Sequence, residues 1–392
     1  MLNKKLLLPV VFIFCFVFAA SGQSPLVASV VHTKYTINST ILGEERTILV
    51  RVPLNYAERN DKYPVVYMLD AHPPQNAMMI GIIEQQVWGG QIPDMIVVGI
   101  QNTNRGRDMT PTKVNDGRGE SGGADKFLQF IETEVMPLVE KNYRTQPYKI
   151  FAGHSLGGLL AVYSFVSRPD LFNAYIAASP VLGWDNNFVI KRAEELFKQK
   201  KEFKKTMFVA LGDEPDLSKG FNSFEELLKK TNPKGIDYEF RQFADENHGS
   251  VVLPAYYAGL RKIFAGWNPP QPPRGTVPDN AVADLENHYK KLTERFGYTI
   301  LIPETTLNQV GYILLRNNQM PEAIEVFRKN SVNYPYSANA LDSLAEAYEK
   351  NGQLKPAQEN YEKAYKMAEK YGEAQLAKSA KANYERLVSK SK

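Results

Sequence analysis

The spacing of hydrophobic positions changes along this chain, and each spacing predicts a different kind of element. Apolar and polar residues alternate in the runs VVHTKYTI and RTILVRVP, between Val30 and Pro53, which predicts an antiparallel hairpin. Continuous apolar runs follow, and such runs are typical of buried parallel strands. They lie at 64–71, 94–102, 148–153, 174–180 and 206–212, with a last strand at 236–243.

Helical spacing appears between these runs. Apolar residues recur at Phe127, Ile131, Val135 and Leu138, which predicts a helix over 124–142. Further helices are predicted at about 76–88 and 187–200. Strands that alternate with helices predict an α/β fold with a mostly parallel, doubly wound sheet, whose functional groups gather at the carboxyl ends of the strands.

The composition changes at Trp267. The segment NPPQPPRGTVPDN, residues 268–280, is rich in proline and predicts an extended linker. Beyond it the apolar pattern is helical and repeats at an offset of 34 residues, so that Ala323 and Phe327 align with Ala357 and Tyr361. This period resembles the tetratricopeptide repeat and predicts a small all-α domain over 281–392, which would bind a partner protein or mediate self-association.

The first residues have the form of a secretory signal peptide. Lys4 and Lys5 precede an apolar run from Leu6 to about Ala20, which predicts a cleaved segment at 1–22 and no membrane anchor afterwards. The first domain is then expected at 23–267, and the protein is expected to be exported, either to a periplasm or out of the cell.

Cysteine usage and charge exclude several classes of function. Cys15, within the predicted signal peptide, is the only cysteine of the chain. A mature protein without it would have no disulfide, no thiolate metal site and no cysteine nucleophile. The chain has 47 basic and 43 acidic residues, which is close to balanced and gives no indication of nucleic-acid binding.

One motif carries chemistry. Gly153-His154-Ser155-Leu156-Gly157 fits G-x-S-x-G and lies between a strand-like run and a helix-forming run of small residues. Strand, tight turn and helix are what a nucleophile elbow requires, because the turn holds the serine Oγ out at the edge of the sheet. The sequence therefore predicts Ser155 as a nucleophile.

A serine hydroxyl needs a base to take its proton, and His248 is the best placed of the five histidines. It follows the last predicted strand, in the chain order nucleophile, acid, base. The acid is expected just after Gly212, where we favour Glu214, then Asp216, then Asp213.

Backbone amides are expected to bind the oxyanion that forms on the attacked carbonyl. The amide of Leu156 opens the helix after the serine and is the first predicted donor. The second should come from the loop after the strand at 64–71, from Ala71 or His72.

Three side chains are candidates for substrate contact. Arg107 follows a strand end and would either line the cleft or pair internally with Asp108. Trp184 follows the strand at 174–180 and would either stack on an aromatic or sugar-like group or pack against the protein. His154, inside the motif with its side chain directed away from the serine Oγ, is the third.

Several segments together resemble the putative esterase family of α/β-hydrolases, which contains esterase D, feruloyl esterases and the trilactone esterases of catechol siderophores. The similarity covers about 30–265, and its segments are LGEERTILVRVP, YPVVYMLDA, IPDMIVVGIQNTNRGRDMTPT, FAGHSLGGLLAVYSFVSRPDLFNAYIAASPVLGW and ENHGSV. The resemblance implies an α/β-hydrolase fold, with Ser155 as nucleophile and His248 as base. Relatives often have Asp-Gly in place of Asp70-Ala71, and some siderophore esterases work with a Ser-His pair alone.

The main hypothesis is an exported serine carboxylic-ester hydrolase that forms an acyl-enzyme on Ser155 and needs neither a metal nor an organic cofactor. Its substrate would be a small-molecule ester, either of the siderophore type or a hydroxycinnamoyl or acetyl ester of a carbohydrate. Two alternatives are an acyltransferase that uses the same elbow and an inactive scaffold that binds a partner through its repeats.

Overall fold

The computed structural model describes residues 32–54, 56–57, 60–115, 117, 119–200, 202–269 and 280–390. The predicted signal peptide and most of the predicted linker lie outside these residues. Residues 32–392 belong to one compact unit. No helix among the described residues combines the length and hydrophobicity that a membrane crossing requires.

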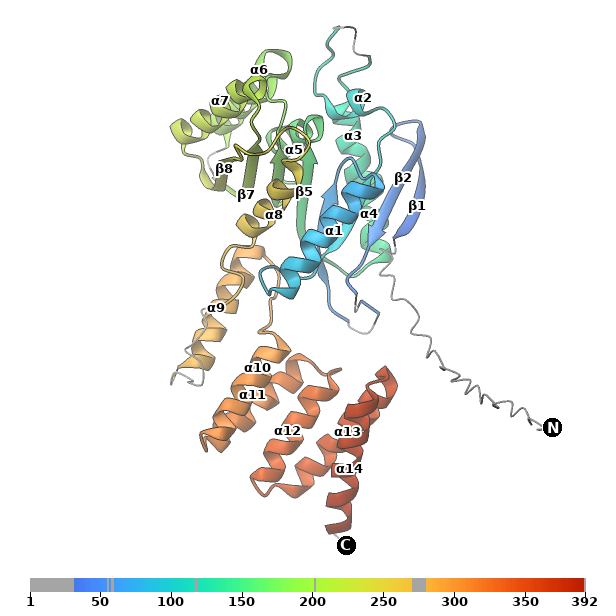
Figure 1. Ribbon diagram of the computed structural model, residues 1–392, viewed down its shortest axis with the longest axis vertical. Helices are drawn as coiled ribbons and strands as arrows, with labels where there is room; N and C mark the ends of the chain where they lie inside the picture. Colours follow the sequence, from blue (N-terminus) through green and yellow to red (C-terminus); the bar gives the residue numbers. More distant parts are fainter. Residues whose placement is uncertain are drawn as a thin grey trace, which may run out of the picture. The chain divides into compact units, whose positions relative to one another are not determined.

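The sheet consists of β1 Thr33–Ser39, β2 Glu44–Arg51, β3 Tyr63–Met68, β4 Ile96–Ile100, β5 Thr145–His154, β6 Ala174–Ala178, β7 Glu202–Leu211 and β8 Lys234–Gln242. Its eight strands lie in the order β1-β2-β4-β3-β5-β6-β7-β8 (Figure 1). β1 and β2 form the predicted antiparallel hairpin, β2 is antiparallel to β4, and the later pairings are parallel. The prediction of a mostly parallel sheet is therefore confirmed.

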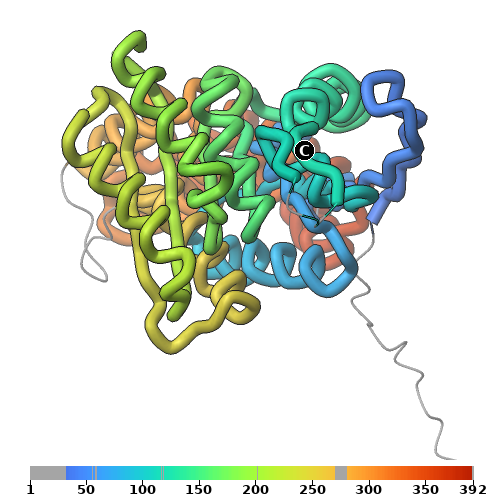
Figure 2. The backbone as a smooth tube through the Cα atoms, turned by 90° about the horizontal axis from the view of Figure 1, so that it is seen from above, coloured from blue at the N-terminus to red at the C-terminus, as the bar shows by residue number. Residues whose placement is uncertain are grey.

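Helices cover both faces of the sheet. On one face lie α1 Pro73–Trp88 and α8 Val252–Ile263; on the other lie α3 Ala124–Phe130, the π-helical turn η1 Ile131–Val135, α4 Met136–Asn142, α5 Leu156–Ser167, α6 Trp184–Gln199 and α7 Pro215–Thr231 (Figure 2). Successive side chains of a strand point to opposite faces. Accordingly Val65 and Tyr67 join one core cluster, and Val66 and Met68 join the other. This double burial explains why the central strands are continuously apolar.

Some helices differ from the prediction. The helix predicted over 124–142 contains the π-helical turn η1 at its centre. α6 begins at Trp184, but residues 185–187 have left-handed backbone angles, so its regular turns start just after 187, close to the predicted start. α7, α8 and the short helix α2, Arg105–Met109, were not among the predicted elements. α2 follows β4 directly, so it stands at the edge of the sheet where the predicted site residues gather.

The C-terminal region is entirely helical within its described residues, with α9 Ala281–Phe296, α10 Glu304–Arg316, α11 Met320–Asn333, α12 Ala338–Lys350, α13 Leu354–Tyr371 and α14 Ala374–Lys390. The predicted alignment relates α10 and α11 to α12 and α13. Gly311 on α10 packs so closely on Phe327 of α11 that a Cβ there would lie 2.6 Å from the ring. The aligned Ala345 and Tyr361 share a buried cluster. Their assignment as tetratricopeptide repeats stays a prediction.

α9 packs directly against the sheet-containing part of the chain. The ring of Phe296 lies 5.0 Å from that of Tyr148 and 5.2 Å from that of Phe264, between ring centroids. Arg295 donates hydrogen bonds to the carbonyls of Ile263 and Ala265 at the end of α8. The hydrophobic core thus continues across the predicted boundary at 268–280.

Candidate active site

Ser155 lies in a strained turn between β5 and α5. Its backbone angles are φ 60° and ψ −116°, a conformation that non-glycine residues rarely adopt. A Cβ at Gly153 would collide with the carbonyl of Gly157, which explains the small residue at that position. Leu156 is the first residue of α5, so its amide has no partner within the helix and points out of the helix N-terminus. This is the geometry of the predicted elbow.

His248 and Glu214 meet at the same edge of the sheet. The Nδ1 atom of His248 is hydrogen-bonded to Oε1 of Glu214, which lies in the loop after β7. The side chain of Glu214 is 8% exposed and that of His248 is 46% exposed. Among the described residues, no hydrogen bond joins Ser155 Oγ to His248; in unliganded enzymes this bond is often long and tightens when substrate binds.

The surroundings of Glu214 distinguish it from the neighbouring acids. Its Oε2 accepts hydrogen bonds from the Ser179 hydroxyl and, at 2.9 Å, from the Gly212 amide. Burial alone would raise the pKa of Glu214, but the hydrogen bonds from Ser179, His248 and Gly212 outweigh it and lower the pKa. Asp216 lies in the first turn of α7 and is exposed. Of the three predicted acids, Glu214 is the one that contacts the histidine.

Ser179 is a site residue that the sequence did not single out. It follows β6, is fully buried and has φ 43°. Its hydroxyl donates to Glu214, so it helps to orient the carboxylate. The one sequence signal was its place just after a buried strand, which many residues of such a fold share.

Both candidates for the second oxyanion donor, the amides of Ala71 and His72, are hydrogen-bonded within the protein. The amide of Ala71 donates to the carbonyl of Ile100 at 3.2 Å, a bond that an oxyanion would have to displace. The amide of His72, the other candidate, donates to the carbonyl of Asp70 within a three-residue turn. Such a bond is bent and more easily exchanged. We therefore favour the amide of His72 over that of Ala71 as the donor that would act together with Leu156, and this assignment stays a prediction.

Arg105 joins the loops after β3 and β4 to the end of β5. It donates from Nε to Asp70 Oδ1 at 2.7 Å and from Nη2 to Asp70 Oδ2 at 3.1 Å. The same Nη2 donates to the carbonyl of His154 at 2.9 Å. The loops after β3 and β4 are thereby fixed to the residue that precedes the nucleophile.

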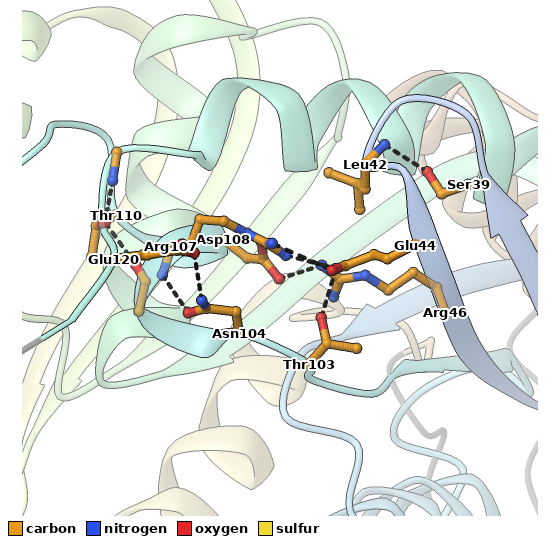
Figure 3. Close-up of polar contacts among 12 residues, drawn as sticks. Ser39, Leu42, Glu44, Arg46, Thr103, Asn104, Arg107, Asp108, Thr110 and Glu120 are labelled. Atoms are coloured by element: carbon orange, nitrogen blue, oxygen red, sulfur yellow. Dashed lines mark hydrogen bonds and ion pairs between the residues drawn. The ribbon is translucent and has the colours of Figure 1, made fainter.

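Arg107 is occupied by an internal brace (Figure 3). Its Nε donates to Asp108 Oδ1 at 2.8 Å and its Nη2 to Glu44 Oε1 at 2.6 Å. The fully buried Arg46 forms ion pairs with the same two carboxylates. Hydrogen bonding to Glu44 and Asp108 raises the pKa of Arg107, and its bond to Glu44 lowers the pKa of that carboxyl to about 2. Of the two predicted roles for Arg107, the structure shows the internal pairing, and contact with substrate stays a prediction.

Trp184 links two loops of the site. Its indole Nε1 donates to the Thr112 hydroxyl at 3.0 Å, and its ring packs partly buried against the core. The next residues, Asp185, Asn186 and Asn187, all have left-handed backbone angles, which aspartate and asparagine adopt more readily than other non-glycine residues. Contact between Trp184 and a substrate stays a prediction.

His154 lies beside His248. Its Nε2 is 2.7 Å from the backbone carbonyl of His248, and the two ring centroids are 4.5 Å apart. The carbonyl can only accept, so Nε2 carries the proton. This nitrogen is engaged within the protein, and contact between His154 and a substrate stays a prediction.

The described residues contain no group of three or more histidine, cysteine, aspartate or glutamate side chains arranged to hold a metal ion.

Comparisons with known proteins point in one direction. Residues 39–220 match the family described as putative esterase. The chain is 31% identical over 229 residues to the ferri-bacillibactin esterase of Bacillus subtilis, a match that covers 51% of this chain and 78% of the relative. It is 29% identical over 279 residues to the siderophore triacetylfusarinine C esterase of Aspergillus fumigatus, covering 57% of this chain and 90% of the relative.

Solved structures of other proteins have a fold similar to that of this chain. An IroE-like serine hydrolase from Shewanella oneidensis has a TM-score of 0.66 and 29% identity, and the match covers 78% of this chain and 100% of that one. An uncharacterised protein from Capnocytophaga ochracea has a TM-score of 0.63 at 19% identity and covers 90% of this chain and 100% of that one. A coverage of 90% exceeds the sheet-containing part, so the similarity in fold reaches into the C-terminal helices.

Proposed function

The chain belongs to the putative esterase family and is a serine esterase, and from this premise we propose that Ser155 is its nucleophile, His248 its general base and Glu214 the acid that orients the histidine. One observation carries the assignment. The strained Ser155, at a strand–helix junction, shares its edge of the sheet with the hydrogen-bonded pair of Glu214 and His248.

The reaction then runs in two steps. His248 takes the proton of Ser155 as Oγ attacks the ester carbonyl, and the oxyanion accepts hydrogen bonds from the amides of Leu156 and His72. The carbon–oxygen bond to the alcohol breaks, and the alcohol leaves with the proton from His248. Water, deprotonated by His248, attacks the acyl-enzyme and releases the acid, which restores Ser155.

Glu214 supports both steps through His248. Its carboxylate accepts the Nδ1 proton, which leaves the lone pair of the neutral ring on Nε2, where a base is needed. It also stabilises the imidazolium that forms after proton transfer. The low pKa of Glu214 keeps it ionised in this role.

We further propose that the substrate is a siderophore-type ester. The two curated relatives described above are named as esterases of siderophores. The form of residues 1–22 supports export of the mature enzyme.

A panel of esters tests the proposal. A catechol trilactone, a feruloyl ester and acetylated xylan are incubated with the wild type, with Ser155→Ala and with Ser389→Ala, which removes an exposed hydroxyl on α14 as a matched control. We expect the trilactone to be cleaved fastest, by the wild type and Ser389→Ala only. Preference for the feruloyl or acetyl ester would refute the substrate, and activity of Ser155→Ala would refute the mechanism.

A further inference from the structure

We propose that His154 is a positioning residue. Its Nε2 donates a hydrogen bond to the backbone carbonyl of His248, and this bond holds the catalytic base at the correct distance from Ser155, the residue that follows His154 in the chain. The proposal rests on the proposed roles of Ser155 and His248. It concerns a direct bond between the residue before the nucleophile and the base itself, 2.7 Å long.

The histidine loop, residues 243–251, is stabilised largely by bonds of its own. Asn247 Oδ1 accepts from the amides of Gly249 and Ser250, and Ser250 Oγ accepts from the amide of Asn247. These bonds give the loop a shape. They do not fix where it lies relative to Ser155.

The other hydrogen bonds that anchor this loop lead to β7 and the residues that follow it. The amide of Phe243 donates to Leu211, the amide of Asp213 donates to Glu246, and His248 is bonded to Glu214. Among the hydrogen bonds of the described residues, only that of His154 joins the loop to β5, the strand that delivers the nucleophile. Because β6 separates β5 from β7 in the sheet, the anchors on β7 reach Ser155 less directly.

The ring of His154 suits this role because it is held firmly and is neutral. Arg105 donates to its backbone carbonyl, which fixes the residue from below. Burial first, and then the neighbouring His248, lower the pKa of His154, against smaller opposing effects that include the charge of Asp70. A neutral ring donates the bond without placing a second positive charge beside the imidazolium that forms on His248.

A pair of amide variants separates positioning from other roles. His154→Gln places an amide nitrogen near the former Nε2 and can still donate to the His248 carbonyl, whereas His154→Asn is one methylene too short. Misplacement of a catalytic group by about 1 Å costs on the order of 100-fold in rate. We therefore expect kcat for p-nitrophenyl acetate to fall about 10- to 100-fold in His154→Asn, while its KM stays within about threefold of the wild-type value. The kcat of His154→Gln should lie within about threefold of the wild-type kcat.

The rates are expressed per active site, and active sites are counted by titration to completion with a fluorophosphonate probe. Partly unfolded protein is then not counted and does not lower the measured kcat. Equal kcat in the wild type and both variants would overturn the proposal, and so would an equal loss in both. A change confined to KM would make His154 a substrate contact instead. Failure of the proposed function would look different, because the wild type itself would then not react with the probe.

Discussion

Replacement of Glu214 by glutamine is the most informative single change at this site. The amide oxygen of the substituted side chain can keep the bonds that the carboxylate accepts from Ser179 and Gly212. Its NH₂ group then faces Nδ1 of His248 and donates to it. The ring is forced into the tautomer that carries its proton on Nε2, where the lone pair for Ser155 is needed.

The size of the effect follows from this tautomer. The corresponding change of acid to amide in a Ser-His-Asp protease lowers kcat by about 10⁴. We expect Glu214→Gln to lower kcat by about 10³ to 10⁴, which is about 4 to 5.5 kcal/mol of transition-state stabilisation. KM should stay within about threefold, since Glu214 is only 8% exposed and both of its oxygens are bonded within the protein.

The assay is steady-state hydrolysis of p-nitrophenyl acetate, with Asp216→Asn as the matched control. Asp216 lies two residues on, is exposed and makes no contact with His248 among the described residues. We expect it to keep at least half of the wild-type kcat. If Glu214→Gln keeps activity within about threefold, the site works as a Ser-His pair. If Asp216→Asn shows the large loss instead, the assignment of the acid is wrong.

Three further predictions concern the rest of the chain. A chain ending at Asn280 loses α9 and exposes the aromatic rings that Phe296 covers, so it should give far less soluble protein than the full chain, as measured by soluble yield and ester hydrolysis; equal yields would contradict this role of α9. Arg107→Ala removes the bonds to Asp108 and Glu44 and should lower the thermal midpoint while KM stays within about twofold. A large rise in KM with no change in the midpoint would instead identify Arg107 as a substrate contact. Burial first, and then Glu346, raise the pKa of Asp342 to about 6, so the folded state binds its proton more tightly than the unfolded state and loses stability as the pH rises through 6. At about pH 8, Asp342→Asn should therefore increase the free energy of unfolding by up to about 3 kcal/mol and raise the thermal midpoint accordingly. At about pH 4 the substitution should leave the midpoint unchanged, and an equal effect at both pH values would contradict the raised pKa of Asp342.

The elements that could be predicted well from the sequence are those whose structure depends on neighbouring residues in the chain. The strands around Val66 and Ile176 are buried on both faces, so their continuous apolar runs admit few other structures. The elbow at Ser155 needs small residues where the chain approaches itself, and Gly153 meets that need. The fold could thus be predicted from neighbouring residues alone, and the turn at Ser155 has the backbone geometry that its motif predicts.

The remaining features depend on contacts between distant residues. The internal pairing of Arg107 depends on Glu44, which lies far away in the chain on another strand. The choice of Glu214 among three neighbouring acids depends on how the loop turns toward His248, and all three have the same local pattern.

Backbone bonds are similarly invisible in the sequence. The amide of Ala71 is occupied because β4 ends beside it and offers the carbonyl of Ile100. Neither the side chain of Ala71 nor that of its neighbours signals this bond. Only the folded chain shows which amides at the edge of the sheet already have a partner.

The central claim is that Ser155 is the nucleophile of this esterase, and one measurement tests it most directly. The wild type and Ser155→Ala are treated with a fluorophosphonate probe, and the labelled residue is located by peptide mass spectrometry. We predict one adduct per chain in the wild type, on the peptide that contains Ser155, with loss of ester hydrolysis in proportion to labelling and no adduct in Ser155→Ala. A wild type that hydrolyses esters while Ser155 stays unlabelled, or an adduct on another residue that accounts for the activity, would contradict the account.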